Sequence, residues 1–127
     1  MKTNILINNE LLQGDSTPEK IINPVNSELI VEVPQSSEEQ VNKAVAAAKK
    51  AFVTWSKTTP GERSSMLLKL ADLIDSKAEE IAKLESLNTG KPFHLALNDE
   101  LPAISDVFRF YAGACRNMPG AAAGEYM

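Results

Sequence analysis

Few residues of this chain have the types and spacing that catalysis requires. The only cysteine, Cys115, has no histidine or glutamate at a helical spacing that could activate its thiol, so we interpret it as a packed core residue. The only histidine, His94, follows a Gly-Lys-Pro turn and is interpreted as a surface or helix-cap residue rather than a catalytic base. One cysteine and one histidine exclude an intramolecular disulfide and a zinc site.

The carboxylates offer little more chemistry. Asp99 and Glu100 are adjacent, so on a helix their side chains point about 100° apart and do not form a general acid/base pair. We interpret them first as negative charge at a helix N-terminus, where the helix dipole favours it. The segment 88–92 is interpreted first as a helix C-cap, although the Asn88 side-chain oxygen and nearby carbonyls could also hold K⁺ or Na⁺.

No cofactor motif is visible in the sequence. The six glycines form neither G-x-G-x-x-G nor G-x-x-x-x-G-K-[ST], so the chain offers no phosphate-binding loop. The aromatic residues Phe108, Phe110 and Tyr111 are interpreted as core or interface packing rather than a ligand-binding box.

Length and composition limit the class of protein. The 127 residues predict one domain with a single core, and 43 % hydrophobic residues with 24 % charged residues are ordinary for a globular protein. A formal charge of −4 predicts no nucleic-acid partner. Every apolar stretch is too short to cross a bilayer, and the N-terminus has no signal-peptide core. We therefore expect a soluble, cytoplasmic protein.

The first third of the chain, residues 4–34, predicts β structure. Residues 5–12 predict a short hairpin, because the Asn8-Asn9 pair tolerates the positive φ of a tight turn. Residues 14–20 predict a loop. Asn23-Pro24 and Asn26-Ser27 mark a turn before a β-branched strand over 29–33, which we expect to end before Pro34.

The rest predicts three amphipathic helices, over about 37–57, 60–88 and 99–117. The expected N-caps are Ser36 with Glu39, Thr59 with Pro60 and Glu62, and Asp99; the expected ends are Gly90 and Met118-Pro119-Gly120. The third helix is apolar on nearly every side. Such a helix needs cover from more protein than this chain supplies.

Four sequence motifs, read in order, carry a resemblance. They are Asn23-Pro24 with the strand that follows it, AF-x-x-W over 51–55, R-x-x-x-L-x-x-L-A-D-x-I over 63–74, and ES-x-N-x-GKP over 85–92. From about Ile5 to Met127 the chain resembles the N-terminal region of NAD(P)-dependent aldehyde dehydrogenases. Three segments are most similar to the γ-aminobutyraldehyde (1-pyrroline) dehydrogenases, relatives of the betaine aldehyde dehydrogenases. They are TTPGERSSMLLKLAD, NDELPAISDVFRFYAGA and AAGEY.

The resemblance implies a function for a longer polypeptide. Family members oxidise an aldehyde with NAD⁺ through a cysteine nucleophile, a glutamate base and Rossmann strands that follow this region. Cys115 does not match the catalytic cysteine, so the resemblance implies an N-terminal fragment that is inactive alone, with the rest of the enzyme or homologous subunits as its partner. The implied substrate is 4-aminobutanal or a related ω-aminoaldehyde.

The resemblance also implies two sites. Carbonyls at Ile21 and Ile22 with the side chain of Asn88 match an alkali-cation site, in which asparagine replaces the usual aspartate. Glu100 matches one of two acidic positions at the substrate entrance, and the other position is Ala103.

The expected fold class is therefore an α+β fragment of the aldehyde dehydrogenase α/β fold, with a β-hairpin and strand followed by three helices. The alternative hypothesis is a stand-alone helical interaction module that binds a protein partner through its third helix.

Overall fold

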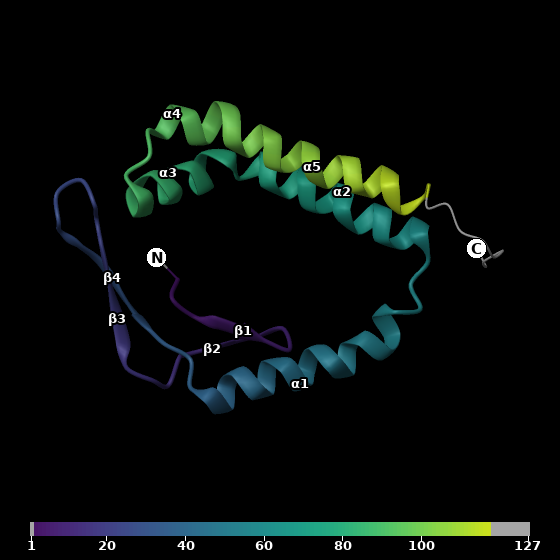
Figure 1. Ribbon diagram of the computed structural model, residues 1–127, viewed down its shortest axis with the longest axis horizontal. Helices are drawn as coiled ribbons and strands as arrows, with labels where there is room; N and C mark the ends of the chain where they lie inside the picture. Colours follow the sequence, from purple (N-terminus) through teal and green to yellow (C-terminus); the bar gives the residue numbers. More distant parts are fainter. Residues whose placement is uncertain (1, 118–127) are drawn as a thin grey trace. The chain divides into compact units, whose positions relative to one another are not determined.

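The computed structural model describes residues 2–117, and the chain divides between Lys57 and Thr58 into two compact units (Figure 1). The chain is α+β, as expected: four short strands precede the helices. The length predicts one domain, whereas the chain divides into two units; the buried hydrophobic cluster of the described residues, Ala82 with Ala96 and Leu101, lies in the second unit. No helix among the described residues is both long and apolar enough to cross a membrane.

A short hairpin opens the first unit. Strands β1 (Ile5–Ile7) and β2 (Glu10–Leu12) pair antiparallel, with Ile7 opposite Glu10. The turn residues Asn8 and Asn9 have φ of 52° and 64°, a conformation that asparagine adopts more easily than most residues. This confirms the predicted hairpin and its turn.

A second hairpin follows, formed by β3 (Pro18–Ile22) and β4 (Leu29–Pro34). The turn between the strands is confirmed, because the Asn23 side chain accepts a hydrogen bond from the Val25 amide at 2.9 Å. The prediction of a loop over 14–20 is wrong from Pro18 onward. Residues 18–20 pair with 32–34, and this partner lies too far along the chain for local turn signals to indicate it.

Helix α1 (Glu38–Trp55) begins one residue later than predicted. The N-cap is Ser37 rather than Ser36, and Gln40 takes the place expected for Glu39 in the capping box. Gln40 is buried, and its Nε2 donates a 2.8 Å hydrogen bond to the Gln13 carbonyl. The later start therefore places a neutral amide, not a carboxylate, where the preceding loop closes over the helix.

The predicted helix over 60–88 is two helices, α2 (Pro60–Ser76) and α3 (Ala78–Thr89). Its ends are confirmed: Thr59 and Glu62 form the capping box, and Gly90 closes α3 with φ 74°. The two helices meet at Lys77, which is neither a glycine nor a proline and so gives no local signal for a helix end. This break allows α3 to bury Ala82 against Ala96 and Leu101, a packing reason that periodicity does not reveal.

The third predicted helix begins earlier than residue 99. It consists of α4 (Phe93–Leu95), a π-helical turn η1 (Ala96–Glu100) and α5 (Leu101–Cys115), so Asp99 lies inside it and is not an N-cap. Pro102 explains the wide turn, because a proline inside an α-helix lacks the N–H donor and its ring clashes with the carbonyl four residues earlier. The predicted stop at 118–120 lies outside the described residues.

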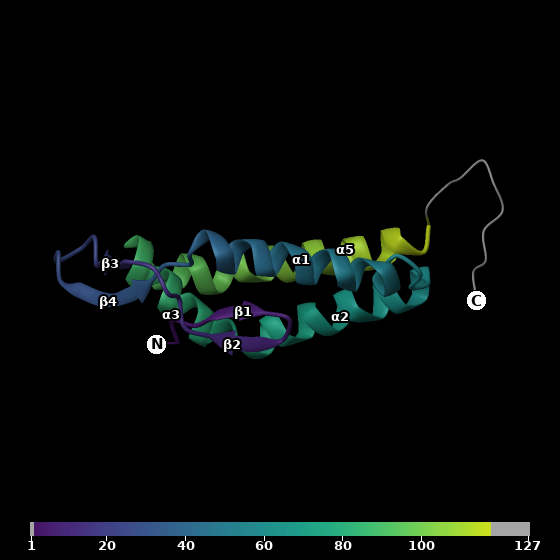
Figure 2. The same ribbon diagram turned by 90° about the horizontal axis from the view of Figure 1, so that it is seen from below.

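Helices α2 and α5 run side by side in opposite directions (Figures 1 and 2). The α5 residues Leu101, Ser105 and Ala112 are buried. Arg109 closes one edge of this contact, with Nη2 2.9 Å from Asp72 Oδ1 and 2.7 Å from Asp75 Oδ2.

Candidate functional site

The second unit holds a cluster of three charged side chains around Lys91. The Lys91 Nζ lies 2.6 Å from Glu100 Oε2 and 3.2 Å from Glu85 Oε1. All three side chains are partly exposed. The hydrogen bond to Glu100, and next the one to Glu85, raises the pKa of Lys91 above its usual value of 10.5. The ammonium is therefore shared by two carboxylates.

Local backbone geometry places Lys91 between these carboxylates. The left-handed Gly90 turns the chain out of α3, so that Lys91 points back along the helix end. The Ser86 hydroxyl donates a 2.7 Å hydrogen bond to the Lys91 carbonyl, and Thr89 Oγ1 accepts one from the Lys91 amide at 3.3 Å. On the other side, Glu100 is the last residue of η1. The π-helical turn thus sets the direction of its side chain.

A small pocket of about 180 Å³ adjoins this cluster. Its lining combines the two carboxylates with four apolar residues: Ile81, Glu85, Ala96, Glu100, Leu101 and Ile104. The volume is below the roughly 300–1,000 Å³ of typical ligand sites. The pocket suits a small cationic group with an apolar body, provided that the group competes with Lys91 for the carboxylates.

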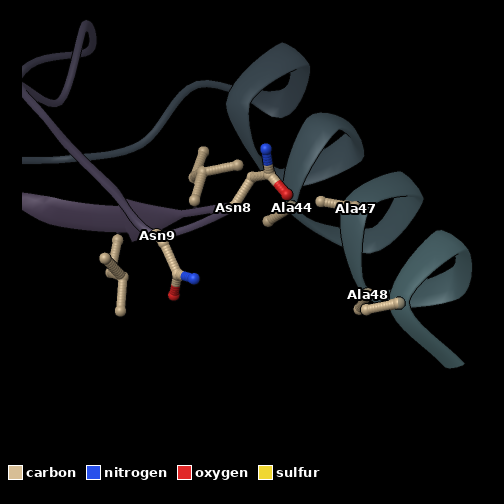
Figure 3. Close-up of a pocket in the computed structure, with 8 residues that line it drawn as sticks. Asn8, Asn9, Ala44, Ala47 and Ala48 are labelled. Carbon is tan, nitrogen blue, oxygen red and sulfur yellow. The ribbon is translucent and has the colours of Figure 1, made fainter. Parts of the chain in front are cut away.

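The first unit has a different pocket, of about 330 Å³, between the β1–β2 turn and α1 (Figure 3). Its helical wall is made of alanines, including Ala44, Ala47 and Ala48. In Figure 3 the Asn8 amide lies beside Ala44, and the Asn9 amide points away from the helix. The lining contains amides and apolar groups but no titratable side chain, so it offers no acid, base or nucleophile.

The residues of the predicted alkali-cation site belong to different units of the structure. Ile21 and Ile22 lie in β3 of the first unit, with an irregular register between them, whereas Asn88 is exposed near the end of α3 in the second unit. The alkali-cation site therefore stays a prediction. Glu100 is the one predicted site residue that contacts a charged partner.

His94 is exposed on α4, which confirms the surface interpretation. Cys115 is only half-buried at the end of α5, so its interpretation as a packed core residue is wrong within this chain. Phe110 and Tyr111 are exposed and stack edge to face, with ring centroids 5.3 Å apart. Core packing of these two rings is therefore wrong within this chain, and interface packing stays a prediction.

Sequence reasoning missed the cluster in which Glu100 and Glu85 share Lys91. Lys91 and Glu85 stand nine and fifteen residues earlier in the chain, beyond a glycine turn and a helix boundary. The one sequence signal for this cluster was the ES-x-N-x-GKP motif, which places the carboxylate of Glu85 and the ammonium of Lys91 around Gly90. It indicated a family resemblance but not the direction of either side chain.

The described residues contain neither a cluster of acidic, cysteine or histidine ligands nor a dinucleotide-binding loop. Across residues 2–117, no three His, Cys, Asp or Glu side chains gather closely enough to hold a metal ion. The strands of this same region form two antiparallel hairpins, and none leads through a glycine loop into a helix as dinucleotide binding requires. These residues therefore do not fit NAD⁺ by themselves.

Comparison with known proteins identifies a single family. The model described as "Aldehyde dehydrogenase family" matches residues 12–125. An aldehyde dehydrogenase of Alternaria alternata is 41 % identical over 93 % of this chain. A structure of PnpE in complex with nicotinamide adenine dinucleotide superposes on 98 % of this chain with a TM-score of 0.90 and 32 % identity. Betaine aldehyde dehydrogenase of Staphylococcus aureus, in complex with NAD⁺, covers 88 % with a TM-score of 0.82 and 32 % identity.

These relatives are much longer than the chain. It covers 24 % of the Alternaria protein, 26 % of PnpE and 23 % of the Staphylococcus enzyme. The match therefore concerns about a quarter of each relative's length.

Proposed function

This chain belongs to the aldehyde dehydrogenase family, and we propose that it forms the N-terminal part of an enzyme that oxidises an aldehyde to the carboxylic acid with NAD⁺. The observation that carries the proposal is the match along 98 % of the chain to PnpE, whose structure holds nicotinamide adenine dinucleotide. We expect the complete enzyme to be cytoplasmic and oligomeric.

The proposed role of residues 1–127 is structural, and the segment alone does not turn over aldehydes. Two observations support this role. The described residues form no phosphate-binding loop, and neither pocket combines a nucleophile with a base. Cys115 has no activating partner among the contacts described, and it stands in a helix that packs on α2.

We propose an ω-aminoaldehyde, such as 4-aminobutanal, as the substrate of the complete enzyme. Glu100 at the 180 Å³ pocket supports this proposal, because a carboxylate near the entrance attracts the ammonium end of such a substrate. The pairing with Lys91 works against it, since a substrate ammonium must share Glu100 with that side chain. Ala103 supplies no second carboxylate.

A bound K⁺ or Na⁺ is a further part of the proposal. The carbonyls of Ile21 and Ile22 and the Asn88 side-chain oxygen are oxygen donors of the kind that hard cations prefer. Asparagine contributes no charge at this position, so we expect weak binding.

A chimera of PnpE with residues 1–127 in place of its first quarter tests the proposal. We expect the isolated chain to show no aldehyde-dependent NADH formation and the chimera to show it. Activity of the isolated chain would contradict the structural role. The chimera should have a lower KM for 4-aminobutanal than for butanal, and Glu100→Gln should raise the KM for 4-aminobutanal alone.

A further inference from the structure

Lys91 lies at the edge of the 180 Å³ pocket, next to two carboxylates that line it. Its Nζ is 2.6 Å from Glu100 Oε2 and 3.2 Å from Glu85 Oε1. Among the described residues, the lining of this pocket includes Glu85 and Glu100 but not Lys91. The lysine therefore contacts both carboxylates from the rim rather than from inside the pocket.

The backbone of Lys91 is fixed, but its ammonium is not. The Ser86 hydroxyl donates a 2.7 Å hydrogen bond to the Lys91 carbonyl, whereas the Lys91 side chain is a flexible four-carbon stem that is 30 % exposed. Glu85 belongs to α3, and Glu100 ends η1. A partly exposed ion pair gains little from a second partner. The ammonium can therefore leave Glu100 and keep Glu85 without any movement of the backbone.

We propose that Lys91 is a specificity-determining residue of the proposed aldehyde oxidation, because its ammonium competes with the ammonium of an ω-aminoaldehyde for Glu100. Glu85 is then a positioning residue, which holds Lys91 while the substrate ammonium contacts Glu100. The inference rests on the proposed function and adds to it a competitor that is part of the chain itself.

Charge balance supports this exchange. Two carboxylates and one ammonium give the cluster a net negative charge. A substrate ammonium brings a second cation, and each carboxylate then has one partner. Without Glu85 the two ammonium groups would share Glu100 alone, and their mutual repulsion would weaken the binding of the substrate. A neutral aldehyde takes no part in the exchange, so its binding depends much less on Lys91.

A purely structural lysine predicts a different pattern. If Lys91 only stabilised the turn after α3, its loss would impair all substrates alike, and arginine would restore function because it keeps the charge. If Lys91 competes with the substrate, Lys91→Met removes the competitor and favours the cationic substrate. Lys91→Arg keeps a competitor whose planar guanidinium binds a carboxylate through two N–H groups, so it gives no gain. The two roles therefore differ in sign.

Steady-state kinetics of the PnpE chimera with residues 1–127 measure this difference. The readout is the KM for 4-aminobutanal divided by the KM for butanal, because this ratio cancels changes that affect both substrates. We expect Lys91→Met to lower the ratio about threefold, the effect of a partly exposed ion pair, and Lys91→Arg to leave it unchanged or raise it. Glu85→Gln should raise the ratio about twofold when Lys91 is present, and by less in the Lys91→Met background.

Lys83→Met is the matched control for charge. Lys83 is on α3 and forms an ion pair with Glu79 at 2.6 Å, and both side chains are exposed. The substitution removes the same charge away from the pocket lining, so the ratio should change by less than about 1.5-fold. An equal fall of the ratio in the Lys83 and Lys91 variants overturns the inference, because net charge then explains it. A ratio that Lys91→Met leaves unchanged or raises also overturns it.

A binding measurement tests the competition without enzyme activity. The probe n-butylammonium is titrated into the 127-residue chain, and the carboxylate carbon resonances of Glu85 and Glu100 are followed by NMR, with n-butanol as the neutral control. We expect the ammonium to shift the Glu100 resonance, with a Kd about threefold lower in Lys91→Met. Equal Kd values in the two proteins, no shift at Glu100, or an equal response to n-butanol overturns the inference.

The two measurements separate this inference from the proposed function. Tighter butylammonium binding in the Lys91→Met chain, together with a chimera that forms no NADH, supports the competition and contradicts the proposed activity. An active chimera whose KM ratio does not change on Lys91→Met supports the activity and contradicts the competition.

Discussion

Glu100 Oε2 lies 2.6 Å from Lys91 Nζ, across the π-helical turn that separates α4 from α5. The residue with the strongest case for attracting a positively charged substrate therefore already has a cation beside it. Because Glu85 shares the same ammonium, the cluster carries two carboxylates and one cation. Its net negative charge leaves room for a second cation only if Lys91 moves.

Lys91→Met should modestly destabilise the second unit at neutral pH, because two partly exposed carboxylates lose the cation between them. The raised pKa of Lys91 means that its contribution is fully present below the usual value of 10.5 and is lost as pH rises through the folded-state pKa. Urea midpoints of the two proteins should therefore differ at pH 7 and converge once the pH rises above the raised pKa of Lys91.

Lys91→Arg is the control for this prediction, since it keeps the charge. A midpoint difference for Lys91→Met that stays constant into strong alkali would argue against the ion pair as its source.

Asp75→Asn should lower stability at pH 6 but not in acid. The Ser105 hydroxyl, and next the Arg109 guanidinium, holds the pKa of Asp75 below its usual 3.8. A depressed pKa contributes stability above the unfolded-state value and loses it as pH falls through the folded-state value. Urea midpoints at pH 6 and pH 2.5 check this, with Asp106→Asn on the exposed face of α5 as the matched control. A deficit of equal size at both pH values would contradict the prediction.

Gly14→Ala should destabilise the first unit by about 1–3 kcal/mol or more, the cost of forcing atoms into a packed site. A Cβ at Gly14 would clash with the Pro34 carbonyl oxygen, which belongs to the backbone and cannot move away as a flexible side chain could. The Ser16 amide donates a 3.0 Å hydrogen bond to the Gln35 carbonyl. Faster hydrogen exchange at this amide in the variant should therefore report the loss of local stability.

Gly113→Ala is the control, because we expect it to raise stability rather than lower it. Position 113 is helical and has nothing within 4 Å of a new Cβ, so alanine should stabilise by about 0.8–1 kcal/mol. Equal effects of the two substitutions on stability would refute the contact at Gly14.

Leu101→Ala should cost about 2–5 kcal/mol in the isolated chain, because Leu101 is 6 % exposed and packs with Ala82 and Ala96. Ile104→Ala, on the same helix but 44 % exposed, should cost less than about 1 kcal/mol. Chemical denaturation of both variants measures the difference. If the Ile104 variant lost as much stability as the Leu101 variant, the side of α5 that carries Ile104 would already be covered within this chain.

Predictions that depend on a few neighbouring residues agree with the structure. The Asn8-Asn9 turn, the Thr59 capping box and the Gly90 cap each need only φ preferences or hydrogen bonds within four residues. The errors lie where distant segments decide. Ser37 replaces Ser36 as N-cap because Gln40 also bonds Gln13, 27 residues away, and Lys77 interrupts a continuous periodic pattern because Ala82 packs beneath Leu101.

The sequence by itself determined the membership of a family, the β-then-helix order and the helix caps at Thr59 and Gly90, because propensity and capping act over short stretches of backbone. Only the tertiary structure decided that Lys91 pairs with both Glu85 and Glu100, and which face of α5 lies against α2. Periodicity shows that α5 is apolar on nearly every side but not which side is covered. Coverage and ion pairing depend on where segments distant in the chain come to lie.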